Sequence, residues 1–217
     1  MVDQAYIQSK INYGYGKAAS KLGQSYVFYR PSTSGNPIVS GNIVATLLVD
    51  LTADFGSTGA RPNLYGKPVW SAMFDRTVTR GGDYFVGPEG TFFIAAQQSL
   101  APTAAVECNA VVTISRPSSP APSINAYEGA VDSDLTPLLT SGPASVLQGT
   151  KGNDGDTKLP GDIRLPWKAI LLPPTPGVQI RNFDVIFDAA PIPNRYIVSG
   201  VELTDLGWRM TAAEEAT

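Results

Sequence analysis

The sequence predicts a mainly β protein made of two tandem small β-barrel or sandwich-like domains, with long loops and one N-terminal helix. The first observation is composition: 18 prolines and 21 glycines separate short apolar runs along 217 residues, which is typical of short strands joined by irregular connections. The second is an internal duplication. Residues 68–74 (PVWSAMF) and 166–172 (PWKAILL) are both proline-led apolar runs that contain a tryptophan.

Further matches follow each run. Arg80 and Asp83 precede one pair of short apolar strands, and Arg181 and Asp184 precede another. Each copy then reaches a Val-Glu pair, at 106–107 and at 201–202. We therefore expect two similar small folds in tandem.

The duplication and the composition shifts divide the chain into four parts. Residues 1–30 form an N-terminal helical arm and a strand, and residues 31–116 form the first β domain, which ends on a strand VECNAVVTI. Residues 117–124 form a linker, because the prolines and serines of RPSSPAPS cannot pair in a sheet. Residues 125–217 form the second β domain.

Residues 3–22 form the one convincing helix. Asp3 is the expected N-cap, and Gly23 is the expected residue after the last turn. Gly14 and Gly16 each cost about 1 kcal/mol inside a helix, so the helix needs packing to persist. The paired glycines indicate close approach of another backbone, and a frayed helix on its own domain is the alternative. Apolar residues at 3–4 spacing give one stripe: Tyr6, Ile7, Ile11, Tyr15, Ala18 and Leu22.

The composition excludes several chemistries. The chain has no histidine and one cysteine, Cys108, so it cannot build a Ser-His or Cys-His nucleophile, a His-ligated metal site or a disulfide framework. We expect Cys108 to be a buried strand residue and expect no cofactor and no structural metal. The net charge of −3 without a basic run argues against sequence-specific nucleic-acid binding. No window approaches 18 apolar residues, so we expect a soluble protein without a membrane span.

Carboxylates are the remaining candidates for chemistry. Asp83 and Asp184 occupy matching positions in the two copies, which favours a turn-stabilising role over the opposed pair of a glycan hydrolase. The Asp/Gly-rich loop 152–156 could bind Ca²⁺, although a solvated loop is favoured. Sugar stacking by the three tryptophans is the further alternative to a place in the core or at a barrel rim: Trp70, Trp167 and Trp208.

Tyrosines gather near the N-terminus, and tyrosine is enriched at protein interfaces. The sequence therefore predicts a subunit contact there, made by one set of residues: Tyr6, Ile11, Tyr13, Tyr15, Tyr26 and Tyr29.

Three stretches resemble structural proteins of tailed bacteriophage virions: residues 6–31, residues 81–117 and residues 194–212. The unit of aspartate, strand, turn and aromatic strand is similar to the small β-barrels of phage neck and tail proteins. The resemblance implies a non-enzymatic virion protein, assembled in the bacterial host cytoplasm as a homo-oligomeric ring. Its implied partners are tail tube, hub, sheath or neck subunits, and its implied place is the tail/baseplate hub or the head–tail neck. The implied contact elements are the helix 3–22 and the loops 52–66 and 148–162.

A carbohydrate- or receptor-binding β protein is the alternative function. It requires at least one tryptophan to lie exposed in a groove. The observations weighed against it are the low charge, 16% of residues, and the duplicated β units with long loops, which suit an assembly component.

Overall fold

The computed structural model describes residues 3–52, 68–117, 135–149 and 167–215. The predicted contact loops 52–66 and 148–162 lie outside the described residues apart from Thr52, Gln148 and Gly149, and the candidate ion loop 152–156 lies wholly outside them. Nearly all of the predicted linker 117–124 does so too.

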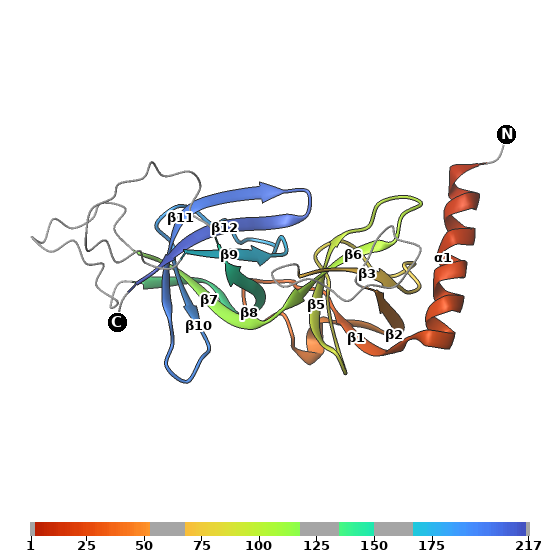
Figure 1. Ribbon diagram of the computed structural model, residues 1–217, viewed down its shortest axis with the longest axis horizontal. Coiled ribbons are helices and arrows are strands. Elements are labelled where there is room, and N and C mark those ends of the chain that lie inside the picture. Colours follow the sequence, from red (N-terminus) through yellow and green to blue (C-terminus); the bar gives the residue numbers. More distant parts are fainter. Residues whose placement is uncertain (1–2, 53–67, 118–134, 150–166, 216–217) are drawn as a thin grey trace, which may run out of the picture.

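Two six-stranded closed barrels follow the helix α1 (Gln4–Leu22) (Figure 1). The first barrel has the strand order β1-β2-β3-β6-β5-β4, and the second has the order β7-β8-β9-β12-β11-β10. Each strand pairs antiparallel with its neighbours. The two orders are the same when six is added to each strand number, so the predicted mainly β class and the predicted tandem β domains are confirmed.

The strands have the following bounds. The first barrel consists of β1 (Gln24–Tyr29), β2 (Ile43–Thr52), β3 (Val69–Met73), β4 (Tyr84–Gly87), β5 (Gly90–Ala96) and β6 (Thr103–Cys108). The second consists of β7 (Ala110–Pro117), β8 (Leu135–Gln148), β9 (Trp167–Leu172), β10 (Val185–Asp188), β11 (Arg195–Thr204) and β12 (Gly207–Glu214). A short 3₁₀ helix, η1 (Ser40–Asn42), precedes β2.

The register of the two barrels is also the same. Phe28 faces Phe85 across the closing seam of the first barrel, and Ile114 faces Ile186 across that of the second. Both barrels have a bulge in the fifth strand, between Ile94 and Ala96 in one and between Val198 and Gly200 in the other. Because bulges bend a strand and increase its twist, the two barrels curve at equivalent places.

This register corrects two details of the predicted duplication. The runs 68–74 and 166–172 do match. Trp70 pairs with Ala105, and Lys168 pairs with Ala212, which occupies the place of Ala105 in the second barrel. Trp70 therefore corresponds to Lys168 rather than to Trp167. Neighbouring residues of a strand point to opposite faces, so the two tryptophans are not equivalent. The two Val-Glu pairs also differ, since residues 106–107 lie on β6 whereas residues 201–202 lie on β11.

The predicted domain boundaries are wrong. β1 belongs to the first barrel rather than to an arm, and β7 belongs to the second barrel rather than to the first domain. The chain crosses between barrels at Asn109, where the expected single strand 106–114 breaks. The Asn109 side chain donates to the carbonyl oxygen of Val146 and accepts from its N–H, at 2.8 and 2.7 Å, which supports the break.

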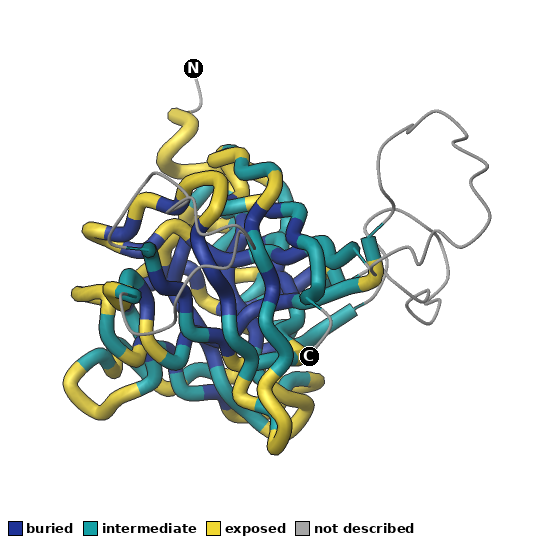
Figure 2. The backbone as a smooth tube through the Cα atoms, turned by 90° about the vertical axis from the view of Figure 1, so that its left-hand side faces the viewer, coloured by how far each residue is buried: buried dark blue, intermediate teal, exposed yellow. Residues whose placement is uncertain are grey.

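The interiors of the barrels are filled with different side chains. The first core is aromatic, with the Phe85 ring stacked between Phe28 and Phe92 at centroid distances of 5.1 and 5.3 Å. The second core is mainly aliphatic, with Ile114, Ile170 and others fully buried. Figure 2 shows the buried residues in the middle of the molecule and the exposed residues around its edge. Neighbouring residues of a strand point to opposite faces of the sheet, and the core side chains are those on the inward face.

A separate apolar cluster joins the two barrels. Tyr84 and Phe93, on the outer face of the first barrel, pack with Leu171 of β9. The Tyr84 hydroxyl donates to the carbonyl oxygen of Pro143 at 3.0 Å in a fully buried contact. Burial raises the pKa of Tyr84 well above its ordinary value, so this hydroxyl remains a donor.

We predict that Tyr84→Phe destabilises the contact between the barrels. The substitution leaves the Pro143 carbonyl buried without this donor, which costs about 1–3 kcal/mol. Urea unfolding of the full chain measures the loss. Tyr13→Phe is the control, because Tyr13 is 65% exposed and its hydroxyl can bond to water, so we expect a change within about 0.5 kcal/mol. Equal effects of the two substitutions would contradict the role given to Tyr84.

Candidate interaction surfaces

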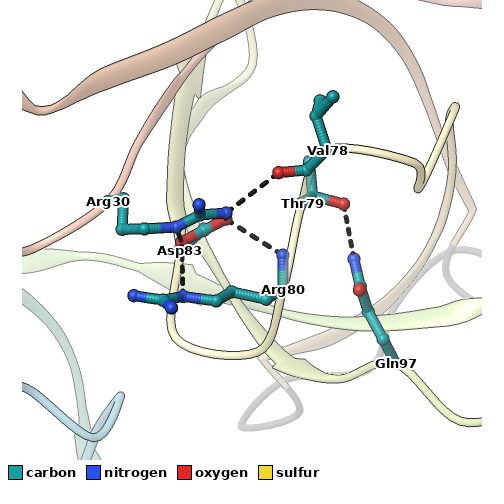
Figure 3. Close-up of polar contacts among 6 residues, drawn as sticks. All are labelled: Arg30, Val78, Thr79, Arg80, Asp83 and Gln97. Carbon is teal, nitrogen blue, oxygen red and sulfur yellow. Dashed lines mark hydrogen bonds and ion pairs between the residues drawn. The ribbon is translucent and has the colours of Figure 1, made fainter.

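Each barrel contains one buried aspartate held by an arginine. In the first barrel Arg30 donates from Nε and Nη2 to the two carboxylate oxygens of Asp83, at 2.9 and 2.8 Å. Asp83 is 1% exposed and also accepts from the backbone N–H of Arg80 at 3.0 Å. Arg30 Nη2 donates further to the carbonyl oxygen of Val78 at 2.9 Å (Figure 3).

The second barrel repeats this arrangement. Arg116 donates to both oxygens of Asp184 at 2.9 Å and to the Gln179 carbonyl at 2.7 Å. Asp184, also 1% exposed, accepts from the backbone N–H of Arg181 at 2.7 Å. The hydrogen bonds to the aspartates raise the pKa of Arg30 and Arg116. We call these two arrangements the arginine clamps.

The clamps favour the turn-stabilising interpretation of Asp83 and Asp184. Each carboxylate already accepts a bidentate arginine and a turn N–H, so its oxygens are committed to holding the strand that follows. The two aspartates also belong to different barrels, rather than facing each other across one cleft as a glycan hydrolase requires. In the described ranges no three Asp, Glu or Cys side chains come together as a metal site.

The arginine of each clamp was not among the residues predicted from the sequence. Both arginines are followed by proline, in Arg30-Pro31 directly after β1 and in Arg116-Pro117 at the end of β7. This repeated dipeptide was the available signal, and it would have placed β1 and β7 as the first strands of the two barrels.

A pocket of about 210 Å³ lies beside the first clamp, where the barrels meet. Its lining includes Arg30, Arg80 and Asp83 from one barrel and Pro174 and Pro176 from the other. The carboxylate in it is already paired with Arg30 at 2.8 Å. The pocket therefore lies at the junction of the barrels, and its carboxylate is committed to the first clamp.

None of the three tryptophans is exposed. Trp70 is half-buried, lies edge-on to Phe92 at a centroid distance of 6.3 Å, and donates from Nε1 to Glu107 at 2.9 Å. Trp208 packs against the second core, and Trp167 is half-buried. The exposed aromatic groove that sugar binding requires is not formed by these side chains.

The inner face of α1 is held to the first barrel mainly by polar contacts. The backbone N–H of Leu100, in the β5–β6 loop, donates to Gln8 at 3.1 Å, and Arg76 donates from Nε to Asn12 at 3.3 Å. The Arg76 guanidinium also lies over the Tyr15 ring, 5.7 Å from its centroid. Ala19 is the one fully buried residue of the helix.

The two ends of the helix agree with the prediction. The Asp3 side chain accepts from the N–H of Ala5 at 3.2 Å, and the N–H of Gly23 donates to Ala19 at 2.8 Å. Of the paired glycines, Gly16 approaches Asp75, whereas Gly14 has open space around it. The expected apolar stripe does not form the inner face, since Tyr6 and Leu22 are exposed.

The outer face of α1 carries an alternating stripe of tyrosine and lysine, which we call the Tyr/Lys stripe: Tyr6, Lys10, Tyr13 and Lys17. Tyr6 is 58% exposed and Tyr13 is 65% exposed. Lys10 lies over the Tyr6 ring at 5.3 Å and Lys17 over the Tyr13 ring at 5.6 Å. The helix contains no acidic residue, so this face is both aromatic and cationic.

The structure divides the six predicted contact residues. Tyr6 and Tyr13 lie on the outer face of α1, while Ile11 and Tyr15 are half-buried. Tyr29 packs at the junction between the barrels. Tyr26 was wrongly assigned to a surface contact: it is 1% exposed inside the first barrel, because alternation along β1 turns Tyr26 and Phe28 inward.

Two further observations bear on function. Comparison of the chain with protein-family models, with curated proteins and with solved structures finds no match. No helix in the part of the chain that the structure describes is long and apolar enough to span a bilayer.

We predict that removing either clamp carboxylate destabilises its barrel. Asp83→Ala and Asp184→Ala each leave an arginine without its carboxylate, at a cost of roughly 2–4 kcal/mol, somewhat below that of a fully buried pair because the arginines are partly exposed. Denaturant unfolding of the full chain measures the loss, with Asp205→Asn on an exposed turn as the control. A loss below about 0.5 kcal/mol in both variants would contradict the role of the clamps.

We predict opposite effects for two glycines of the helix region. A Cβ at Gly23 would lie 2.6 Å from the Ala19 carbonyl oxygen and 2.7 Å from the Val49 backbone, so Gly23→Ala should cost about 1–3 kcal/mol. Gly14→Ala should stabilise the helix by up to about 1 kcal/mol, because Gly14 has open space and alanine favours the helix. Helical circular dichroism and hydrogen exchange of α1 amides measure both changes. Equal responses would contradict this packing of the helix end.

Proposed function

We propose that this protein is a structural component of a tailed bacteriophage virion. In this proposal it assembles as a ring through protein–protein contacts, at the tail/baseplate hub or at the head–tail neck, and it catalyses no reaction. Its partners are further copies of itself and neighbouring tube, hub, sheath or neck subunits.

The observation that carries the proposal is the exposed Tyr/Lys stripe on α1, at one end of the molecule (Figure 1). Tyrosine is enriched at protein interfaces because it presents a large apolar area together with a hydroxyl. The helix is held to its own barrel with little apolar burial, so most of its aromatic surface remains free for a partner.

The barrel interiors support a role in assembly. Both are packed with apolar side chains, and the matched carboxylates are occupied by the arginine clamps. The two interiors hold different side chains but are both apolar, as expected of domains that serve as rigid supports for contacts. No specific observation favours the sugar-binding alternative.

The first test of this proposal is the oligomeric state of the purified full chain, by sedimentation velocity and electron microscopy. We expect rings, and we expect the chain to be found by mass spectrometry in particles released when the encoding cell lyses. A protein that stays monomeric at high concentration and is missing from such particles would contradict the proposal.

We further predict that Tyr6→Ser combined with Tyr13→Ser weakens assembly at least tenfold, because two exposed aromatic anchors are lost. The concentration dependence of sedimentation measures the change. Ile43→Ser is the matched control, since Ile43 is an exposed apolar residue of the first barrel, 49% exposed, and pairs with Tyr29 at the far end of β1 from the residues that follow α1. Unchanged assembly in the double variant would remove α1 from the interface.

A further inference from the structure

The pocket beside the first clamp, which we call the junction pocket, holds more positive than negative charge. Arg30 and Arg80 bring two guanidinium groups to its described lining, and Asp83 brings the one carboxylate. Arginine stays protonated in proteins. Because Arg30 already pairs with Asp83 at 2.8 Å, the charge of Arg80 is left without a hydrogen-bonded partner.

Guanidinium N–H groups of both arginines have no acceptor among the described residues. Nε of Arg80 approaches the Asp83 carboxylate only to 3.9 Å, beyond hydrogen-bonding distance, and the Arg80 side chain is 62% exposed. Arg30 uses Nε and Nη2 in the clamp, which leaves Nη1 unused. Figure 3 shows both side chains beside the Asp83 carboxylate. Both arginines can therefore still donate to a ligand.

The backbone of the lining adds one more donor. The N–H groups of Arg30, Gly82 and Asp83 donate to carbonyl oxygens elsewhere. The N–H of Gly81 bonds to no acceptor in the described part of the chain. The remaining lining residues are prolines, which have no N–H to offer: Pro31, Pro174 and Pro176.

Glycine at the turn lets the second barrel close over the pocket. Gly82 has φ 90°, and a Cβ there would lie 3.3 Å from the carbonyl oxygen of Pro174. Glycine is the residue that adopts such a backbone at a close approach without strain. The matching turn of the second barrel instead carries Phe183, which is 75% exposed. The enclosed wall is therefore a property of the first turn and does not come with the clamp itself.

The size and walls of the junction pocket suit a small charged group. Its volume is about 210 Å³, and a single water needs only about 10–15 Å³ of such space, so a group of several atoms fits. Arginine binds carboxylates and phosphates through paired N–H···O bonds. Opposite charges also attract more strongly where apolar walls, here the prolines, keep water away.

We propose that the junction pocket binds one oxyanion group, a carboxylate or a phosphate. Arg80, Nη1 of Arg30 and the N–H of Gly81 donate to its oxygens. The group belongs either to a free anion or to an acidic side chain of a neighbouring subunit, which presents the same chemistry. This inference goes beyond the proposed assembly function and does not depend on it.

The first test is protection of Arg80 from phenylglyoxal, which modifies exposed arginines, in dilute solutions of the full chain. Arg181 is the internal control, because it is an exposed arginine at the matching turn of the second clamp. Inorganic phosphate, or acetate in a separate series, replaces chloride at constant ionic strength. We expect modification of Arg80 to slow at least tenfold at saturation and that of Arg181 to change less than twofold, as measured by peptide mass spectrometry. Equal protection of both would mean an adventitious ion only and would overturn the site.

The second test compares Arg80→Gln with Arg181→Gln. Each variant keeps the backbone N–H that its clamp carboxylate accepts, so we expect both to fold. A ligand of the folded state raises the unfolding temperature by mass action, and the phosphate dependence of that temperature gives an apparent Kd. We expect this Kd to rise at least tenfold in Arg80→Gln and to stay within twofold of wild type in Arg181→Gln. The same response in all three proteins would show phosphate acting only as a general stabiliser and would contradict the proposal.

Sedimentation velocity distinguishes the two sources of the oxyanion. If the group is a neighbour's acidic side chain, Arg80→Gln weakens self-association at least tenfold and phosphate dissociates the wild-type assembly. If the group is a free anion, neither change affects self-association, while phosphate still protects Arg80. A chain that is monomeric at all concentrations and shows this protection would overturn the assembly function and leave the site standing. Rings whose dilute subunits show no selective protection of Arg80 would overturn the site alone.

Discussion

The ion pair between a strand-ending arginine and a buried aspartate is the constraint on which each barrel depends. Arg30 leaves the end of β1 and Asp83 immediately precedes β4, and these two strands form the seam that closes the barrel. Burying a carboxylate is costly unless it is paired and hydrogen-bonded. The turn is held further, because Asp83 also accepts from the backbone N–H of Arg80. The clamp therefore fixes where β4 begins, and with it the register of Tyr29 against Tyr84.

The two copies share this frame and differ in what they present outside it. The outward residues Tyr84 and Phe93 join the barrels in the first copy, and the register puts Val185 and Ile197 at the equivalent places in the second. Gly82 has a positive φ of 90° and approaches Pro174, whereas Phe183 at the matching turn has φ 71° and is 75% exposed. The arginine clamps close each barrel without the help of these outward residues, so the outward residues can differ between the two barrels.

The sequence predicted the class of fold and the duplication because periodic features survive in both copies. The apolar runs 68–74 and 166–172 and the Arg-Asp turns recur position by position, and they mark the third strand and the closing turn of each barrel. The first strand of the second barrel was harder to find, since β7 continues almost directly from β6 and one interrupted apolar run conceals two strands. Tyr26 shows why the contact set was only partly right. A cluster of tyrosines says nothing about which face each occupies, and that depends on the register of β1 within the closed barrel.

The way α1 is attached has a consequence for any assembly built on it. The helix contains two glycines, each costing about 1 kcal/mol, and buries one residue fully. Most of the stability of a helix in a protein comes from packing rather than from propensity, so the stability of α1 depends on the contacts of Gln8, Asn12 and Arg76 on its inner side. A partner on the outer face would stabilise the same helix that binds it. Folding of α1 and association through α1 are then thermodynamically linked, because a ligand that binds only the folded form stabilises it.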